Sequence, residues 1–258
     1  MAMALVTGAS GGIGREMALY LAKHGVASLL VARREAQLNA LQADIMRDHQ
    51  MHCPIMVGDI TDPAVQQALL LKLQQEQWQV DYLINNAGIG DFGPFAAAAP
   101  ERISQLMQLN IIALTQLTQL LLPQMIARGS ARILQLGSIA GMQPLPRFAV
   151  YAASKAYVIA FSEALAVELA PHNISVTCLC PGVTETDFFT NANMQTVSFV
   201  KQGLKRAQSA EVVAQMGIEA MLAGKRLVFT QQSQAWLAAL QSMVPRAWVL
   251  ALANRLMR

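Results

Sequence analysis

The fold is decided by the stretch ALVTGASGGIG, residues 4–14. Residues 4–6 form a short apolar strand, and after the glycines a helical pattern places Ile13, Met17 and Leu21 on one side. A strand, a glycine-rich turn and a helix together bring backbone N–H groups and a helix N-terminus against a pyrophosphate. Glycine is needed there because a Cβ would block the tight turn and the approach of the phosphates. We therefore expect a dinucleotide site, although the spacing Gly-x-x-x-Gly-x-Gly differs from the common one and a turn without a ligand is the alternative.

Strands and helices alternate along the rest of the chain. Further strands are expected at 27–32, 54–57, 82–84, 133–136, 174–179 and 227–229, and helices at 35–48, 63–77, 102–127, 151–170 and 211–223. The strands are continuously apolar, which is typical of a parallel sheet covered by helices on both faces. We therefore predict an α/β fold, a Rossmann-type doubly wound parallel sheet of about seven strands.

Two arginines, Arg33 and Arg34, follow the second strand. Dinucleotide-binding folds commonly carry a carboxylate there, which binds the ribose 2′-hydroxyl. A guanidinium at Arg33 can pair with a 2′-phosphate instead, and no carboxylate is present to repel that phosphate. The sequence therefore favours NADP(H) over NAD(H); the alternative is an exposed arginine pair at the start of a helix.

Polar residues also follow the third and fourth strands. Asp59 follows the third, and Asn85-Asn86-Ala87-Gly88 follows the fourth, where the ligand crevice of an open α/β sheet lies. Helix capping by Asp59 and a simple turn at 85–88 are the alternatives. Asn110 interrupts the apolar face of the helix 102–127, and a buried amide must be hydrogen-bonded. It is therefore either a structural pin or part of a polar site.

Three residues suggest proton-transfer chemistry: Ser138, Tyr151 and Lys155. Tyr151 and Lys155 are one helical turn apart, so their side chains share a face. The unperturbed pKa of a phenol is about 10, and a neighbouring ammonium lowers that pKa. Ser138, on a loop after the fifth strand, would hydrogen-bond a substrate oxygen, which suits proton transfer to or from a carbonyl or alcohol. Alone, the Tyr-x-x-x-Lys spacing is a weak signal, because such pairs occur by chance on helix surfaces.

Together these motifs resemble the short-chain dehydrogenase/reductase family, in its single-domain NAD(P)-dependent branch. The resemblance extends from Val6 to about Thr186 and rests on Thr7-Gly8-x-x-x-Gly12-Ile13-Gly14, Asp59, Asn85-Asn86-Ala87-Gly88, Asn110, Ser138, Tyr151-x-x-x-Lys155 and Pro181-Gly182-x-x-x-Thr186.

The resemblance implies roles for the matching residues. Tyr151 would be the catalytic acid/base, and Ser138 would polarise the substrate carbonyl. Lys155 would lower the pKa of the tyrosine and bind the nicotinamide ribose, while Asn110 would hold a water that relays protons. The implied cofactor-binding residues are Gly8, Ser10, Gly12, Ile13, Gly14, Arg33, Asp59, Ile60, Asn86, Ala87, Gly88, Tyr151, Lys155, Pro181, Gly182, Val183 and Thr186.

The expected function is hydride transfer between NADP(H) and a carbonyl or secondary alcohol. Apolar residues on loops that border the site favour a hydrophobic ketone or 3-oxoacyl-type substrate. They are Phe92, Phe95, Met142, Leu145, Phe148, Phe188 and Phe189. One alternative is a non-catalytic NADP(H)-binding regulatory protein that acts through a partner or a membrane surface. Another is a nucleotide-sugar epimerase or dehydratase, but such relatives usually carry a larger C-terminal domain.

Composition limits the other classes of function. The 258 residues are 54% hydrophobic and 14% charged, with a net charge of +3 and no run of basic residues. These values exclude a disordered chain and give no support to nucleic-acid binding. The histidines show no metal-ligand spacing, so we assign no metal.

We assign residues 1–230 to a NAD(P)-binding catalytic domain with a substrate flap at about 187–207, and 231–258 to an extension of the same domain.

That extension is basic and amphipathic. Beyond Glu219 the sequence has no acidic residue, and apolar positions such as Trp236, Leu240 and Trp248 recur. Such a segment can lie on an anionic membrane, cover the substrate pocket or pack on a second subunit, and the two packing alternatives are preferred. We expect a homodimer or homotetramer, because the helices 102–127 and 151–170 resemble those that pair subunits in relatives.

The expected localisation is cytoplasmic. The chain start lacks the charged segment of a signal peptide, and no apolar run looks long enough to span a bilayer. Peripheral membrane contact through the extension is left open.

Overall fold

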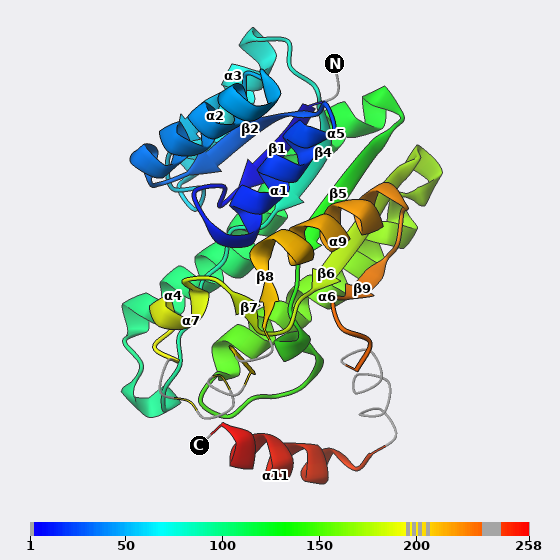
Figure 1. Cartoon of the computed structure of the whole chain (residues 1–258). Helices are drawn as coiled ribbons and strands as arrows, with labels where there is room; N and C mark the ends of the chain where they lie inside the picture. The colour runs from blue at the N-terminus through cyan, green and yellow to red at the C-terminus, as the bar shows by residue number, and fades with distance from the viewer. Residues whose placement is uncertain are drawn as a thin grey trace.

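A seven-stranded parallel sheet forms the centre of the molecule, in the order β3-β2-β1-β4-β5-β6-β9 (Figure 1). The computed structural model describes residues 3–194, 197, 200, 203–204, 207–233 and 244–257. The strands are β1 (Met3–Thr7), β2 (Ala27–Ala32), β3 (Ile55–Val57), β4 (Val80–Asn85), β5 (Ala131–Leu136), β6 (Ile174–Cys180) and β9 (Leu227–Phe229). The predicted α/β class with a doubly wound parallel sheet is confirmed.

Helices cover both faces of this sheet. One face packs against α1 (Gly12–Lys23), α2 (Glu35–His49) and α9 (Ala210–Leu222), and the other against α3 (Pro63–Gln75), α5 (Leu114–Arg128) and α6 (Ala149–Glu168). Within β1, Ala4 and Val6 belong to the first core while Leu5 belongs to the second. Because successive side chains of a strand point to opposite faces, a strand buried on both sides must be apolar throughout.

The order of the strands reverses at β1. The chain runs outward from β1 to β2 and β3, then returns to the other side of β1 to form β4. A crevice opens at the carboxyl ends of the strands at such a reversal. The loops after β1 and β4 meet there, since Asn86 Nδ2 donates to the Thr7 carbonyl at 2.9 Å and Asn86 N to Thr7 Oγ1 at 3.1 Å.

The expected helix 102–127 is not a single α-helix. It consists of α4 (Pro100–Met107), a π-helical segment η2 (Gln108–Ala113) and α5. Asn110 lies within η2, where its side chain bonds the loop after β4 and α6. A π-helical turn inside an α-helix is often found at a functional site. The sequence pattern did not indicate it.

Shorter elements follow β6. Thr184–Glu185 (β7) pairs in parallel with Gln208–Ser209 (β8), and α7 (Phe188–Asn191) lies between them in the sequence. The expected flap at 187–207 therefore contains some regular structure, and part of it lies outside the described residues. The remaining short elements are the 3-10 turns η1 (Phe95–Ala97), η3 (Ile139–Met142) and η4 (Ala170–His172).

The C-terminal extension contains a helix, α11 (Arg246–Leu256), which begins after Pro245. In Figure 1 this helix, drawn in red, lies at the same end of the molecule as α7, β7 and β8, away from the N-terminus. The earlier part of the extension, including Trp236 and Leu240, lies outside the described residues.

Two helical stretches, Pro100–Arg128 and Ala149–Glu168, are long and apolar enough by length and composition to cross a bilayer. The expectation that no such run exists was wrong on that criterion. Both stretches nevertheless contribute to buried cores, with Leu117 and Leu121 of the first and Leu165 of the second packed in the core under one face of the sheet. Core helices of this kind account for the composition without a membrane.

Candidate active site

A large cavity lies at the carboxyl ends of the strands. Its volume is about 1150 Å³, and it extends from the glycine turn after β1 to α11. Pockets for one drug-sized ligand usually have about 300–1,000 Å³. This cavity therefore has room for a dinucleotide and a second, smaller molecule beside it.

The glycine turn forms one end of the cavity. Gly8 and Gly12 have φ of 68° and 55°, in the left-handed region that favours glycine, and a Cβ on Gly8 would come within 2.8 Å of Asn86 Nδ2. Helix α1 begins after Gly11 with no side-chain cap and no acidic residue in its first turn. Its first N–H groups thus have no side-chain partner among the described residues, and such a helix terminus binds a phosphate group well. The residues present fit a dinucleotide pyrophosphate.

Gly14 has a different function from the other glycines of the motif. It does not line the cavity, whereas Ser10, Gly12 and Ile13 do. A Cβ on Gly14 would lie 2.6 Å from the Gly8 carbonyl oxygen. Gly14 therefore allows α1 to pack closely against the turn, and its effect on a nucleotide is indirect.

Two guanidinium groups border this end of the cavity. Arg34 donates from Nε to Ser10 Oγ and from Nη2 to the Ser10 carbonyl, both at 3.1 Å. Arg33 is 69% exposed in its side chain and places Nη1 3.5 Å from Asp59 Oδ2. Both arginines line the cavity. The sequence interpretation selected Arg33 alone; the adjacent Arg34 was visible as part of a pair, but its contact with Ser10 was not.

Asp59 also lines the cavity, together with Ile60. Its Oδ1 accepts hydrogen bonds from Thr61 N at 3.0 Å and Thr61 Oγ1 at 2.8 Å. Burial alone would raise the pKa of this carboxyl, but the bonds from Thr61 and the charge of Arg33 outweigh it and hold the pKa below its usual value. Helix α3 is capped by Asp62, which accepts from Ala64 N at 2.8 Å, so capping does not explain Asp59.

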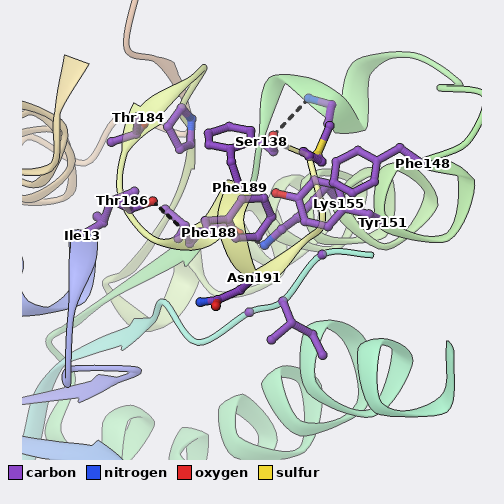
Figure 2. A pocket seen from close by; sticks show the side chains of 18 of the residues that line it. Ile13, Ser138, Phe148, Tyr151, Lys155, Thr184, Thr186, Phe188, Phe189 and Asn191 are labelled. Atoms are coloured by element: carbon purple, nitrogen blue, oxygen red, sulfur yellow. Dashed lines mark hydrogen bonds between the residues drawn. The ribbon is translucent and has the colours of Figure 1, made fainter. Parts of the chain in front are cut away.

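The middle of the cavity is formed by the loops after β4 and β6. Its lining there includes the expected Asn86, Ala87, Gly88, Pro181, Gly182, Val183 and Thr186. Thr186 lies beside the start of α1, since its Cγ2 would be 3.1 Å from a Cβ on Gly12. Thr186 Oγ1 also accepts from Phe188 N at 3.3 Å (Figure 2). The loop after β6 thus joins the glycine turn to the apolar end of the cavity.

Ser138, Tyr151 and Lys155 come together in the same cavity, and all three are buried (Figure 2). Tyr151 and Lys155 project from the first turns of α6, and Ser138 follows β5. Lys155 Nζ donates to the Leu136 carbonyl at 2.6 Å and lies 5.8 Å from the centre of the Tyr151 ring. The Tyr151 ring stacks on that of Phe148, with centroids 4.3 Å apart. The expected grouping of these side chains is present.

The pKa values of these groups differ from the sequence expectation. Burial raises the pKa of the Tyr151 phenol, although its hydrogen bond with Ser138 opposes the shift. Burial also lowers the pKa of Lys155 to about 8. The expected lowering of the tyrosine pKa by lysine was wrong for the protein groups alone, because desolvation raises this pKa and the opposing effect comes from Ser138 rather than from Lys155. The phenol therefore keeps its proton near neutral pH, and it can serve as a proton donor.

Asn110 lies behind the cavity and does not line it. Its side chain is 1% exposed; Oδ1 accepts from Ile89 N at 3.0 Å, and Nδ2 donates to the Ile89 carbonyl at 2.9 Å and to Ser154 Oγ at 3.1 Å. Ser154 Oγ in turn donates to the Tyr151 carbonyl at 2.7 Å. Asn110 therefore connects the loop after β4 with the helix that carries Tyr151 and Lys155, and it is a positioning residue in this geometry.

The other half of the cavity is mainly apolar, and the polar residues Arg102, Gln143, Asp187 and Asn191 also belong to the cavity lining. Of the loop residues expected there, Met142, Leu145, Phe148, Phe188 and Phe189 line it. Phe92 packs behind them and does not line the cavity, and Phe95 is largely exposed beside a separate small pocket. Those two expectations were wrong, because the loop after β4 lines the cavity only as far as Gly90. Residues of the C-terminal extension take their place, namely Val244, Trp248, Val249, Leu252, Ala253, Leu256 and Met257.

Comparison with known families and curated proteins agrees with this geometry. A family model described as short chain dehydrogenase matches residues 2–196. A very-long-chain 3-oxoacyl-CoA reductase from Phaeosphaeria nodorum is 36% identical over 180 residues, which are 68% of this chain and 53% of that protein. The chain thus spans about half the length of this relative. The oxidoreductase UcpA of Escherichia coli is 34% identical over 184 residues, 71% of this chain and 69% of that protein.

Solved structures give the same family and differ in the nucleotide that they hold. A short-chain dehydrogenase from Sphingobium yanoikuyae in complex with NADPH superposes with a TM-score of 0.83 at 28% identity, covering 96% of this chain and 98% of that one. A 3-ketoacyl-(acyl-carrier-protein) reductase from Brucella melitensis complexed with NADH has a TM-score of 0.79 at 28% identity, covering 88% and 96%. Since the two have the same sequence identity to this chain, they do not decide between the nucleotides.

Proposed function

Because this chain belongs to the short-chain dehydrogenase family, we propose that it is an oxidoreductase that uses NADPH to reduce a hydrophobic ketone or 3-oxoacyl-type carbonyl to the alcohol. One observation carries this proposal. A buried tyrosine, serine and lysine lie in a single cavity, between a glycine turn that fits a pyrophosphate and a wall of apolar side chains. Bound NADPH supplies the hydride that adds to the carbonyl carbon.

The protein groups supply the proton and stabilise the charge. As the carbonyl carbon gains the hydride, its oxygen gains negative charge, and Tyr151 Oη donates the proton that completes the alcohol. Ser138 Oγ is available to donate a hydrogen bond to the same oxygen, which stabilises the charge where it develops. Lys155, held by the Leu136 carbonyl, carries a positive charge below its pKa of about 8 and stabilises the phenolate that remains.

The preference for NADPH rests on Arg33, Arg34 and Ser10. The two guanidinium groups border the nucleotide end of the cavity, and charge-assisted bonds to a 2′-phosphate are stronger than bonds to a 2′-hydroxyl. Asp59 is paired with Arg33, so its negative charge is partly compensated at that place. The expected result is tighter binding of NADPH than of NADH.

The substrate class rests on the lining of the cavity. Aromatic and aliphatic side chains surround Tyr151, including Phe148 and Phe188, whose ring centres lie 4.3 and 5.3 Å from that of the tyrosine. Apolar walls of this kind favour an apolar substrate, since burial of hydrocarbon drives its binding. The curated relative named as a 3-oxoacyl-CoA reductase supports the acyl form of this proposal.

We also propose that the protein is cytoplasmic and forms a homodimer or a homotetramer. The helices α4 to α6 expose large apolar side chains, among them Met107, Ile112, Tyr157 and Val167. Light scattering of the full chain tests this; a monomer at all concentrations would contradict it.

The test of the reaction is NADPH oxidation in the presence of a panel of ketones and 3-oxoacyl thioesters. Wild-type protein should turn over at least one hydrophobic member of the panel. Tyr151→Phe should reduce kcat by about 10²–10⁴-fold, the usual contribution of a positioned proton donor, while NADPH still binds. Full activity of this variant would refute the role given to Tyr151. A wild-type protein that binds NADPH and reduces no member of the panel would favour the non-catalytic alternative.

A further inference from the structure

Helix α11 leaves an apolar flank uncovered at the cavity. Trp248, Leu252 and Leu256 are four residues apart, so they form one stripe along the helix. They are 71%, 60% and 44% exposed, and all three line the cavity that contains Tyr151. Large apolar side chains are here exposed toward the active-site cavity.

A second stripe attaches the helix to the domain. Val249, Ala253 and Met257 follow the same spacing, and Ala253 and Met257 are buried. Met257 packs in the same apolar cluster as Phe148 and Tyr151. This second stripe fixes the orientation of α11 and lines the cavity from the buried side of the helix, while Trp248, Leu252 and Leu256 line it from the exposed side. Figure 1 shows α11 lying across that end of the molecule as a separate rod.

Charge is absent from the part of α11 that lines the cavity. Arg246, Asn254 and Arg255 are exposed and are not among the lining residues. A ligand that covers Trp248, Leu252 and Leu256 therefore meets only hydrocarbon and an indole ring. Together with Phe148 and Phe188 at the tyrosine, the lining forms an apolar path from the reacting group to the end of the chain.

We propose that the exposed stripe of α11, residues Trp248, Leu252 and Leu256, binds the alkyl chain of the substrate and sets the preferred chain length. The occupant is an unbranched neutral hydrocarbon chain, attached to the carbonyl that Tyr151 protonates. The identity of the reacting carbonyl rests on the proposed function, whereas the alkyl site rests on the lining of the cavity.

A series of 3-oxoacyl thioesters of N-acetylcysteamine, from butanoyl to dodecanoyl chains, tests this proposal with NADPH as reductant. In wild-type protein kcat/KM should rise with chain length, by up to about fourfold for each methylene that reaches the stripe. Leu252→Ala and Trp248→Ala should flatten this rise, so that the loss of kcat/KM relative to wild type grows with chain length and is smallest for the butanoyl substrate.

Leu250→Ala is the matched control. Leu250 is 40% exposed on the same helix and does not line the cavity, so its variant should keep the chain-length dependence of wild type. The same slope in wild type, Leu252→Ala and Trp248→Ala would overturn the proposal. A second result would also overturn it. If light scattering shows that Leu252→Ala dissociates the oligomer while kcat/KM keeps its wild-type dependence on chain length, the stripe contacts a second copy of the chain.

Binding measurements separate this proposal from the proposed reaction. Calorimetric titration of the NADPH-bound protein with 3-hydroxydodecanoyl-N-acetylcysteamine should give an affinity about fivefold weaker for Leu252→Ala than for Leu250→Ala. If Leu252→Ala binds more weakly as expected but no thioester is turned over, the alkyl site is supported and the proposed reaction is refuted. Turnover with equal affinities in both variants would support the reaction and refute the alkyl site.

Discussion

The two halves of the cavity differ in how the chain builds them. The nucleotide half consists of turns that directly follow sheet strands, with hydrogen bonds such as Asn86 to Thr7 and Thr61 to Asp59. The substrate half consists of apolar side chains from the start of α6, from α7 and from α11. The first is fixed by the sheet, while the second depends on the packing of segments that are far apart in the sequence.

This difference suggests that the two halves can be altered separately. A change among the polar groups of the nucleotide half should alter nucleotide affinity and leave the preference among carbonyl substrates unchanged. A change among the apolar groups of the other half should do the opposite. Residues at the junction of the two halves should break this separation. Lys155 and Asn110 are the candidates, because a Cβ on Gly88 would lie 3.5 Å from Lys155 Nζ and 3.3 Å from Asn110 Oδ1.

Lys155→Met should have the largest effect among the junction variants. Loss of a positioned positive charge at the phenol should reduce kcat by about 10²–10³-fold for every substrate. A similar fall in kcat with either nucleotide and with every carbonyl substrate would show that the junction serves both halves. A variant with kcat within a few fold of wild type would contradict the assignment.

The same variant should be more stable than wild type near neutral pH. The pKa of Lys155 is about 8 in the folded protein and 10.5 ordinarily, so the unfolded chain binds the proton more tightly. This lowered pKa reduces the free energy of unfolding by its full amount below pH 8, and the reduction becomes smaller as the pH rises toward 10.5. Lys155→Met should therefore raise the free energy of unfolding by about 1–2 kcal/mol at pH 7, after allowance for the lost bond to Leu136.

Urea unfolding of both proteins at several pH values measures this difference. The advantage of the variant should shrink between pH 8 and pH 10. An advantage that does not change with pH would mean that packing, rather than the buried charge, accounts for it.

Asn110→Leu should have the next largest effect. It leaves the Ile89 N–H and carbonyl without their partner and loosens the loop after β4 against α6. We expect kcat to fall by about 10²-fold, as expected when catalytic groups are misplaced by about 1 Å, and the free energy of unfolding to fall by about 1–3 kcal/mol. Activity and chemical denaturation should be measured on the same preparation. A loss of stability with unchanged kcat would restrict Asn110 to a structural role.

Arg34→Ala should affect only the nucleotide half. Loss of one exposed charge-assisted contact should weaken NADPH binding by about tenfold and change NADH binding little. Arg15→Ala is a suitable control, since Arg15 pairs with Glu16 and Asp44 and does not line the cavity. Equal affinity of the wild type for the two nucleotides, measured by fluorescence titration, would remove the argument for a 2′-phosphate site.

Thr186→Val should have the smallest effect. It keeps the shape of the side chain beside Gly12 and removes the hydroxyl that accepts from Phe188 N. We expect nucleotide affinity to fall by about threefold and the preference among ketones to change slightly, because this loop joins the two halves. No change in either quantity would indicate that the loop is held by its backbone alone.

The nucleotide half could be predicted from the sequence because its signals are local. Apolar runs of strand length, glycines at Gly8 and Gly12 and the arginines after β2 each specify their own backbone or chemistry within a few residues. Since parallel strands place their carboxyl ends at one edge of the sheet, the order of the motifs was enough to bring them together. Ser138 was predicted at the end of the fifth strand for the same reason, whereas Tyr151 and Lys155 were predicted from their spacing of one helical turn.

Tertiary structure alone decided the rest. The π-helical turn at Asn110, the contact of Arg34 with Ser10 and the placement of α11 along the cavity depend on contacts between segments that are remote in sequence. The pKa shifts belong here too, since desolvation depends on what surrounds a group after folding. The sequence by itself determined the sheet and the strand ends at which the candidate polar residues lie, because these follow from local pattern and strand order. Only the folded chain decided the electrostatics of Tyr151 and the apolar wall of the substrate half, because both arise from long-range packing.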